Sequence, residues 1–163
     1  MAVTLADLFR ASRGEPVEWA GRRVHAMLEF AGLTTDKRLL IEFAQASPLR
    51  PQALRLRVRG GVIELREQEL DDVVLWYDSV PGTVITRLRP KTPGVPMSLR
   101  VWNAWRDAAG TMQAWIGNAG MLIEERGAGV TVVRCSDGFD EPSFDDLVAT
   151  LRLTEVSTAS NET

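Results

Sequence analysis

The strict alternation of residues 53–59, ALRLRVR, is the feature that most constrains the fold of this chain. From Leu54 onward, three apolar residues alternate with three arginines, and a period of two places the two sets on opposite faces of a β-strand. A strand with one apolar and one charged face is typical of an antiparallel sheet that packs on one side only. The segment therefore predicts a β-sandwich or a barrel.

A Gly60-Gly61 pair follows this strand and leads into a second predicted strand over residues 62–66. Gly-Gly is common in two-residue hairpin turns, so we predict a β-hairpin over residues 53–66. The expected cross-strand pairs are Val58 with Ile63, Leu56 with Leu65, and Arg57 with Glu64.

Short alternating segments recur along the chain and are separated by turn-forming residues. They predict further strands over residues 22–30, 38–45, 72–78, 83–89, 99–106, 111–118, 121–125, 130–135 and 146–153. We predict an all-β domain, an antiparallel β-sandwich (jelly-roll-like) or a barrel.

One short helix is expected at the N-terminus. Thr4 precedes an amphipathic segment and Asp7 follows it by three residues, the spacing of a capping box. Gly14 and Pro16 end the helical pattern.

Composition predicts a single domain over residues 1–153. The chain has 163 residues, of which 45% are hydrophobic and 25% are charged, as in an average globular protein. Residues 154–163 are polar and rich in Ser and Thr, and we expect a disordered tail there.

Charge and targeting features narrow the class of protein. The net charge of −3 lacks the basic excess of nucleic-acid binders, so no nucleic-acid partner is expected. The first residues lack the features of a signal peptide, and no apolar segment is long enough to span a membrane. A single cysteine excludes an intramolecular disulfide. We expect a cytoplasmic, bacterial-type protein without a membrane partner.

Residues 98–120 carry three of the five tryptophans and predict a second hairpin, turning at residues 107–110. Pairing Arg106 with Thr111 places Trp102 opposite Trp115 on one face and Trp105 on the other, more apolar face. Trp105 is then a core residue. With Arg100, Arg106 and Gln113, Trp102 and Trp115 are the candidate ligand- or partner-binding residues. The alternative is that Trp102 and Trp115 are packing residues under a covering element.

The predicted core contains one apolar residue or more from most strands. Its members are Leu56, Val58, Ile63, Leu65, Leu75, Val101, Trp105, Ile116 and Leu147. Asn103 and Asn118 fall on the apolar face of the tryptophan hairpin, and we expect each to bond a bulge or loop backbone group.

An acidic segment precedes the last strand. Asp137, Asp140, Glu141 and Asp145 are candidate calcium ligands, although their spacing is not that of an EF-hand. The alternative, which we favour, is a solvated turn in which Asp145 caps backbone donors. Residues 143–153 resemble the closing strand of calcium-containing carbohydrate-binding jelly rolls. We expect no metal and no cofactor.

The sequence contains no recognised catalytic motif. His25 is the only histidine and falls on the polar side of its strand, and Cys135 is expected to pack as an apolar residue. We therefore expect a non-catalytic binding protein, most simply one that recognises a protein partner through the Trp/Arg face, as an immunity, adaptor or accessory factor. The alternatives are a carbohydrate- or small-ligand-binding module and an unorthodox barrel-type enzyme such as a cyclase or isomerase.

Overall fold

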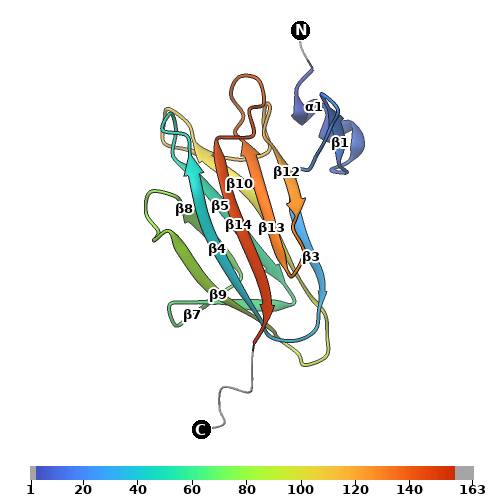
Figure 1. The fold of residues 1–163 in the computed structure, drawn as a ribbon, viewed down its shortest axis with the longest axis vertical. Coiled ribbons are helices and arrows are strands. Elements are labelled where there is room, and N and C mark those ends of the chain that lie inside the picture. Colours follow the sequence, from blue (N-terminus) through green and yellow to red (C-terminus); the bar gives the residue numbers. More distant parts are fainter. Residues whose placement is uncertain (1–2, 157–163) are drawn as a thin grey trace.

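Two antiparallel sheets pack face to face in the computed structural model, which describes residues 3–156 (Figure 1). The larger sheet has the order β12-β13-β14-β4-β9-β6-β7. Its strands are β4 (Lys37–Ala46), β6 (Gly61–Leu65), β7 (Gln68–Leu70), β9 (Thr83–Pro90), β12 (Gly120–Glu125), β13 (Val130–Ser136) and β14 (Leu147–Glu155).

The smaller sheet has the order β11-β10-β5-β8, and β3 shares with β11 the free edge of β10. Its strands are β3 (Leu28–Leu33), β5 (Gln52–Arg59), β8 (Asp72–Trp76), β10 (Met97–Arg106) and β11 (Met112–Gln113). The inner faces of the two sheets enclose the main hydrophobic core. The prediction of an all-β sandwich with one short helix is confirmed.

The helix α1 (Leu5–Ser12) begins and ends as its sequence predicts. Thr4 and Asp7 form a capping box, and Arg13 closes the helix in a left-handed conformation with φ of 57°. Leu5 and Phe9 pack into a second, smaller core. This core joins α1 to the hairpin of β1 (Val17–Trp19) and β2 (Arg22–Val24), beside the main sandwich (Figure 1).

The hairpin predicted over residues 53–66 is wrong. β5 pairs with β10 and β8, whereas β6 pairs with β9 and β7, so the chain crosses from one sheet to the other at Gly60-Gly61. A Cβ on Gly61 would lie 2.6 Å from the Met97 sulfur and 2.7 Å from the Arg89 carbonyl oxygen. The two glycines therefore permit a close crossing. None of the predicted pairs forms: Arg57 lies opposite Asp72 and Arg100, and Glu64 binds Arg89.

Other differences concern where strands stop. The predicted strand 22–30 divides into β2 and β3, and His25 between them forms an isolated bridge with Met121 of β12. The predicted strand 111–118 contains only β11, because the chain turns at Trp115 and Gly117 with positive φ angles. β1 and β7 lie in segments for which no strand was predicted. β14 continues to Glu155, past the predicted start of the tail, and residues 157–163 lie outside the described residues.

The core prediction is correct for seven residues. Leu56, Val58, Ile63, Leu75, Val101, Trp105 and Leu147 are buried. Leu65 is half-buried against the core. Ile116 is wrong, since it is 49% exposed in the turn that interrupts the predicted strand. Within residues 3–156, no helix has the length and apolar character that crossing a membrane requires.

Candidate partner-binding surface

Exposed apolar side chains gather at one end of the sandwich. This end is formed by the connections 47–51, 77–82, 114–119 and 137–146, together with Val3 before α1, and we call it the loop end. Of the eight large hydrophobic residues that are exposed among residues 3–156, six lie there, whereas Ile85 and Val95 lie elsewhere. The six are Val3, Leu49, Tyr77, Trp115, Ile116 and Phe139.

Main-chain hydrogen bonds hold these connections together. The Tyr77 amide donates to the Gln52 carbonyl at 2.9 Å, and the Ser47 amide donates to the Asp146 carbonyl at 2.8 Å. The Asn118 amide donates to the Gly138 carbonyl at 3.3 Å, which joins the Trp115 turn to the loop that carries Phe139. The exposed apolar side chains are therefore carried by connections whose main chains are hydrogen-bonded to neighbouring segments.

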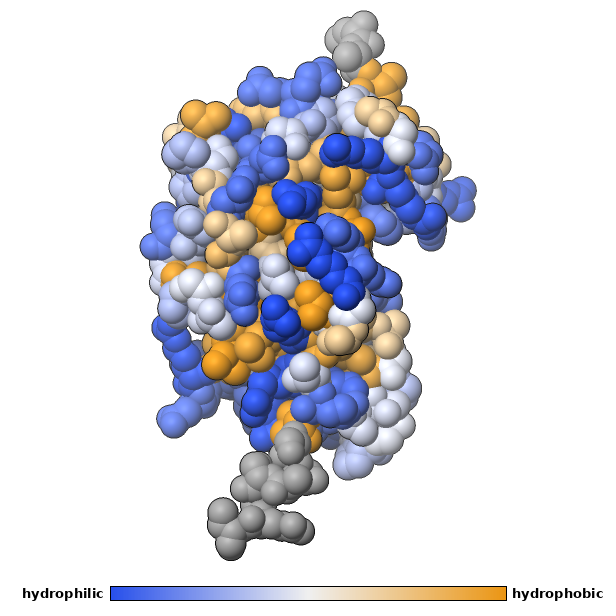
Figure 2. All heavy atoms as spheres, in the orientation of Figure 1, coloured by the Kyte–Doolittle hydropathy of each residue, from blue (hydrophilic) through white to orange (hydrophobic). Residues whose placement is uncertain are grey.

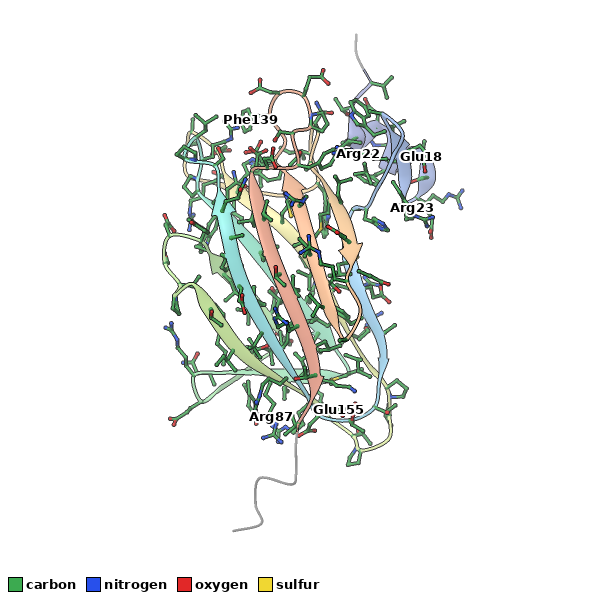
Figure 3. The ribbon with its side chains drawn as sticks, in the orientation of Figure 1. Glu18, Arg22, Arg23, Arg87, Phe139 and Glu155 are labelled. Carbon is green, nitrogen blue, oxygen red and sulfur yellow. The ribbon has the colours of Figure 1, made fainter. Side chains whose placement is uncertain are left out.

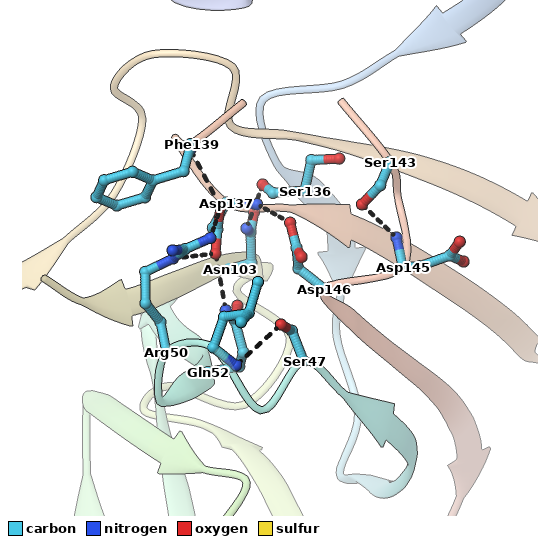
Figure 4. A network of polar contacts seen from close by, with 11 residues as sticks. Ser47, Arg50, Gln52, Asn103, Ser136, Asp137, Phe139, Ser143, Asp145 and Asp146 are labelled. Atoms are coloured by element: carbon cyan, nitrogen blue, oxygen red, sulfur yellow. Dashed lines mark hydrogen bonds and ion pairs between the residues drawn. The ribbon is translucent and has the colours of Figure 1, made fainter. Parts of the chain in front are cut away.

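A buried carboxylate supports the Phe139 loop (Figure 4). Asp137 is fully buried and accepts hydrogen bonds from Arg50 Nε at 2.8 Å and from Gln52 Nε2 at 2.9 Å. Its other oxygen accepts the Phe139 amide at 3.1 Å. The hydrogen bond to Asp137 raises the pKa of Arg50, and the Arg50 guanidinium lies 4.1 Å from the centre of the Phe139 ring. This ion pair fixes the loop while the ring stays exposed.

A second carboxylate, that of Asp146, binds the main chain at the start of the same loop. Asp146 accepts the Asp137 amide at 2.9 Å. Burial raises the pKa of Asp146 against the opposing effect of that hydrogen bond, and the Asp137 charge raises it further. Asn103 donates to the Ser136 carbonyl at 2.9 Å, so this buried amide bonds a backbone group at the end of β13 and not one in a bulge or loop.

Trp115 is presented to solvent by an unusual backbone. Its φ of 58° lies in the left-handed region that few bulky residues adopt. The indole stacks on Trp102, with ring centres 4.7 Å apart and planes 26° apart, and its Nε1 donates to the Ala26 carbonyl at 2.9 Å. Trp115 is 45% exposed and Trp102 only 4%. Trp102 therefore packs beneath Trp115 and offers almost no surface of its own.

The stacking does not arise from the predicted register. Gln113 pairs with Trp105, and Met112 pairs with Arg106, one residue away from the expected alignment. Trp115 instead reaches Trp102 from the turn that follows β11.

The other three predicted site residues divide between two places. Arg106 lies at the loop end, 4.2 Å from the centre of the Trp76 ring, and donates to the Gly110 carbonyl. Gln113 donates to Asp107 at 3.0 Å, which lowers the pKa of that carboxyl. Arg100 lies farther along β10, beside Glu29 at 3.2 Å and opposite Arg57. The structure thus brings Arg106, Gln113 and Trp115 to one end and leaves Arg100 apart.

The acidic candidates do not converge. Asp137 is occupied by Arg50 and Gln52, Asp145 lies 3.8 Å from Arg134, and Asp140 and Glu141 are exposed. Among residues 3–156, no group of three or more His, Cys, Asp or Glu side chains is placed to hold a metal ion. The backbone cap expected of Asp145 comes from Asp146 instead.

The two reactive side chains, Cys135 and His25, do not line the hollows beside the exposed apolar residues. Cys135 is buried between the sheets, and burial raises the pKa of its thiol far above the ordinary range. Partial burial, followed by the Arg23 charge, lowers the pKa of His25.

Shallow hollows surround the exposed side chains. One of about 310 Å³ lies between α1 and Trp115, lined mainly by Ala6, Phe9, Ala26 and Met27. Another of about 340 Å³ lies beside Tyr77 and Arg50. Figure 2 shows apolar residues at the upper end of the molecule, interspersed with hydrophilic ones. The labelled Phe139 side chain lies at that end (Figure 3).

Sequence reasoning missed Leu49, Tyr77 and Phe139. Leu49 stands in SPLRP and Phe139 in DGFDEP, so each is a large apolar residue within a turn-forming segment. Such segments are ordinarily polar, and that contrast was the available signal.

Comparison with known proteins finds no matching family model, no matching curated protein and no matching solved structure.

Proposed function

We propose that this chain is a non-catalytic binding protein that recognises a protein partner through the loop end. The observation that carries the proposal is the gathering of six exposed hydrophobic side chains, three of them aromatic, on connections far apart in the sequence. Trp and Tyr are enriched among the residues that dominate protein interfaces, and scattered exposure would need no such explanation.

The interactions that hold these side chains in place favour the same function. The Asp137–Arg50 pair and the Trp115–Trp102 stack hold Phe139 and Trp115 in place before any partner arrives. A surface that is already ordered loses less conformational entropy on binding, so more of the interaction energy contributes to affinity.

Exposed carboxylates lie beside the apolar residues. Asp78, Asp140 and Glu141 are exposed at the loop end, and Asp7 beside it pairs with the exposed Arg10 at 3.4 Å. These carboxylates favour a partner whose apolar recess is bordered by lysine or arginine. The same carboxylates would be repelled by anionic lipid, which argues against insertion of these loops into a bilayer.

A small ligand is the second candidate. The hollow between α1 and Trp115 is lined mostly by apolar side chains, and its volume of about 310 Å³ falls at the lower end of the range for small-molecule sites. The Trp115 indole would form one wall for a planar ring or a sugar.

The test compares affinity capture from the source cells by three forms of the protein. One is unmodified, one carries Ile116→Ser and Phe139→Ser, and the control carries Ile85→Ser, at an exposed residue on β9. We expect a protein retained by the first and third forms to be lost from the second. Removing interface residues that dominate binding costs 2 kcal/mol or more, about thirty-fold in affinity.

Two results would contradict the proposal. Equal capture of the same proteins by the Ile116/Phe139 variant would show that the loop end is not the binding surface. Sedimentation of the unmodified protein with anionic vesicles, abolished by the same variant, would assign the loop end to a membrane instead.

A further inference from the structure

A cluster of four cations lies on the outer face of the smaller sheet, at the end opposite the loop end. Arg57 and Arg59 come from the end of β5, Arg100 comes from the start of β10, and Lys91 follows β9. With Ser98 and Asp71 they line a hollow of about 400 Å³. Four cations thus face one carboxylate in a chain whose net charge is −3.

The register forces like charges together. Arg57 and Arg100 are direct cross-strand neighbours, and Arg59 faces Ser98. Like charges directly opposite each other destabilise an antiparallel pair. This arrangement therefore costs stability, and a bound anion between the two guanidinium groups would offset that cost.

The acids nearby do not neutralise the cluster. Asp72 lies opposite Arg57, but both of its oxygens are taken by Arg55, at 2.9 and 2.8 Å. Within residues 3–156, Arg57, Arg59 and Lys91 have no carboxylate at ion-pair distance. Arg100 has only Glu29, and both of those side chains are about half-exposed. The guanidinium groups remain available to a ligand.

We propose that this hollow binds a phosphate-bearing small molecule, such as a phosphate monoester or a diphosphate, through Arg57, Arg59, Arg100 and Lys91. Arginine offers paired N–H donors that match phosphate oxygens, and adjacent guanidinium groups suit a group that carries two charges. The volume is that of a small-molecule site. This site lies apart from the loop end and does not depend on its function.

The geometry favours a small molecule over a nucleic-acid strand. Single-strand binders combine a basic groove with exposed aromatic rings on which bases stack. The hollow has no aromatic residue in its lining, and the nearest ring on β10, Trp102, is buried beneath Trp115.

The probe for the test is pyrophosphate, titrated by calorimetry at fixed ionic strength. The variants are Arg57→Gln and Arg100→Gln, and the matched control is Arg22→Gln, which removes the same charge from exposed β2. We expect binding by the unmodified protein and the control. We expect the dissociation constant to rise at least about tenfold in each pocket variant.

Thermal unfolding separates binding from folding. Without pyrophosphate, Arg57→Gln should melt at the same temperature as the unmodified protein or higher, because it relieves the repulsion from Arg100. With pyrophosphate, the melting temperature should rise for the unmodified protein and the control but not for Arg57→Gln. If Arg57→Gln does not fold, Lys91→Gln supplies the same comparison from an exposed loop.

Three results would overturn the proposal. They are the absence of pyrophosphate binding at millimolar concentration, equal binding by the control and the pocket variants, and a single-stranded oligonucleotide that binds through the same arginines far more tightly than pyrophosphate.

Discussion

Asp137 and Asp146 lie close together at the Phe139 loop, but their surroundings compensate their charges to different degrees. Asp137 is fully buried against Arg50 and Gln52, whereas Asp146 is half-buried and has one backbone donor. Burial and the Asp137 charge both raise the pKa of Asp146. The ionised form of Asp146 therefore opposes folding, while its hydrogen bond supports the loop.

Replacing Asp146 with Asn is expected to test this balance, because the amide oxygen can still accept the Asp137 amide. A carboxyl whose folded pKa is raised loses stabilising effect as pH increases from its ordinary value to the raised one. The gain in unfolding free energy of Asp146→Asn over the unmodified protein should therefore grow across that window and then stay constant. Water screens the half-exposed group, so we expect a gain of about 1 kcal/mol at most.

Urea unfolding at a series of pH values measures this difference. Asp145→Asn is the control, since it removes the same charge from the neighbouring exposed position. A difference that does not change with pH would show that the Asp146 charge is not opposed by its surroundings.

At the scale of elements, β10 carries buried tryptophans on both of its faces. One face carries Trp105, which is fully buried beside Gly138, and the other face carries Trp102, which is buried beneath Trp115. Gly138 allows the close approach of Trp105, because a Cβ there would lie 2.7 Å from the indole. The strand is therefore covered on both faces near the loop end.

Alanine substitutions of the three tryptophans should distinguish the two that stabilise the fold by packing from the one that is exposed for binding. Trp105→Ala and Trp102→Ala each remove a buried indole, and we expect a loss of roughly 3–5 kcal/mol in unfolding free energy. Trp115→Ala removes a half-exposed ring and one hydrogen bond, so a loss of about 1–2 kcal/mol is expected, together with loss of partner binding. Chemical denaturation measures both.

Equal losses for Trp115→Ala and Trp102→Ala would contradict this division. They would show that Trp115 is a core residue and that its exposure carries no binding function.

At the scale of the whole molecule, α1 and the β1–β2 hairpin form a small unit beside the sandwich. Asn118 connects the two parts: its Oδ1 accepts the Leu5 amide at 3.1 Å and its Nδ2 donates to the Asp140 carbonyl at 2.7 Å. The Ala6 amide donates to the Gly117 carbonyl at 2.9 Å. The core of this unit also contains Phe144 and packs against Leu122 of β12, but it is small compared with the main core, and this favours local opening of the unit.

Hydrogen exchange tests this partition. We expect the amides of α1 to exchange faster than those of β4 and β14. Asn118→Ala removes both hydrogen bonds of the side-chain amide, so the exchange of α1 amides should accelerate about tenfold. The amides of β4 serve as the internal control. Equal acceleration in both regions would show that the unit and the sandwich open as one.

The sequence by itself determined most of the local structure. The alternation in β5 assigned its apolar face to the core, and Thr4, Asp7 and Gly14 defined the helix. These features depend on neighbouring residues and on the period of the element, so they can be derived without knowing the rest of the fold.

Strand partners were decided by the tertiary structure alone. Gly60-Gly61 has the chemistry of a hairpin turn, but the approach of Met97 and the pairing of β5 with β10 turn it into a crossing between sheets. The loop end has the same origin, because Leu49, Trp115 and Phe139 meet only when distant strands end together. The arginine cluster also depends on the tertiary structure, because the cross-strand neighbour of Arg57 is Arg100 and not Glu64, which is nearer in the sequence. Partner choice in a sheet depends on contacts between residues far apart in the chain, and a local pattern carries no record of them.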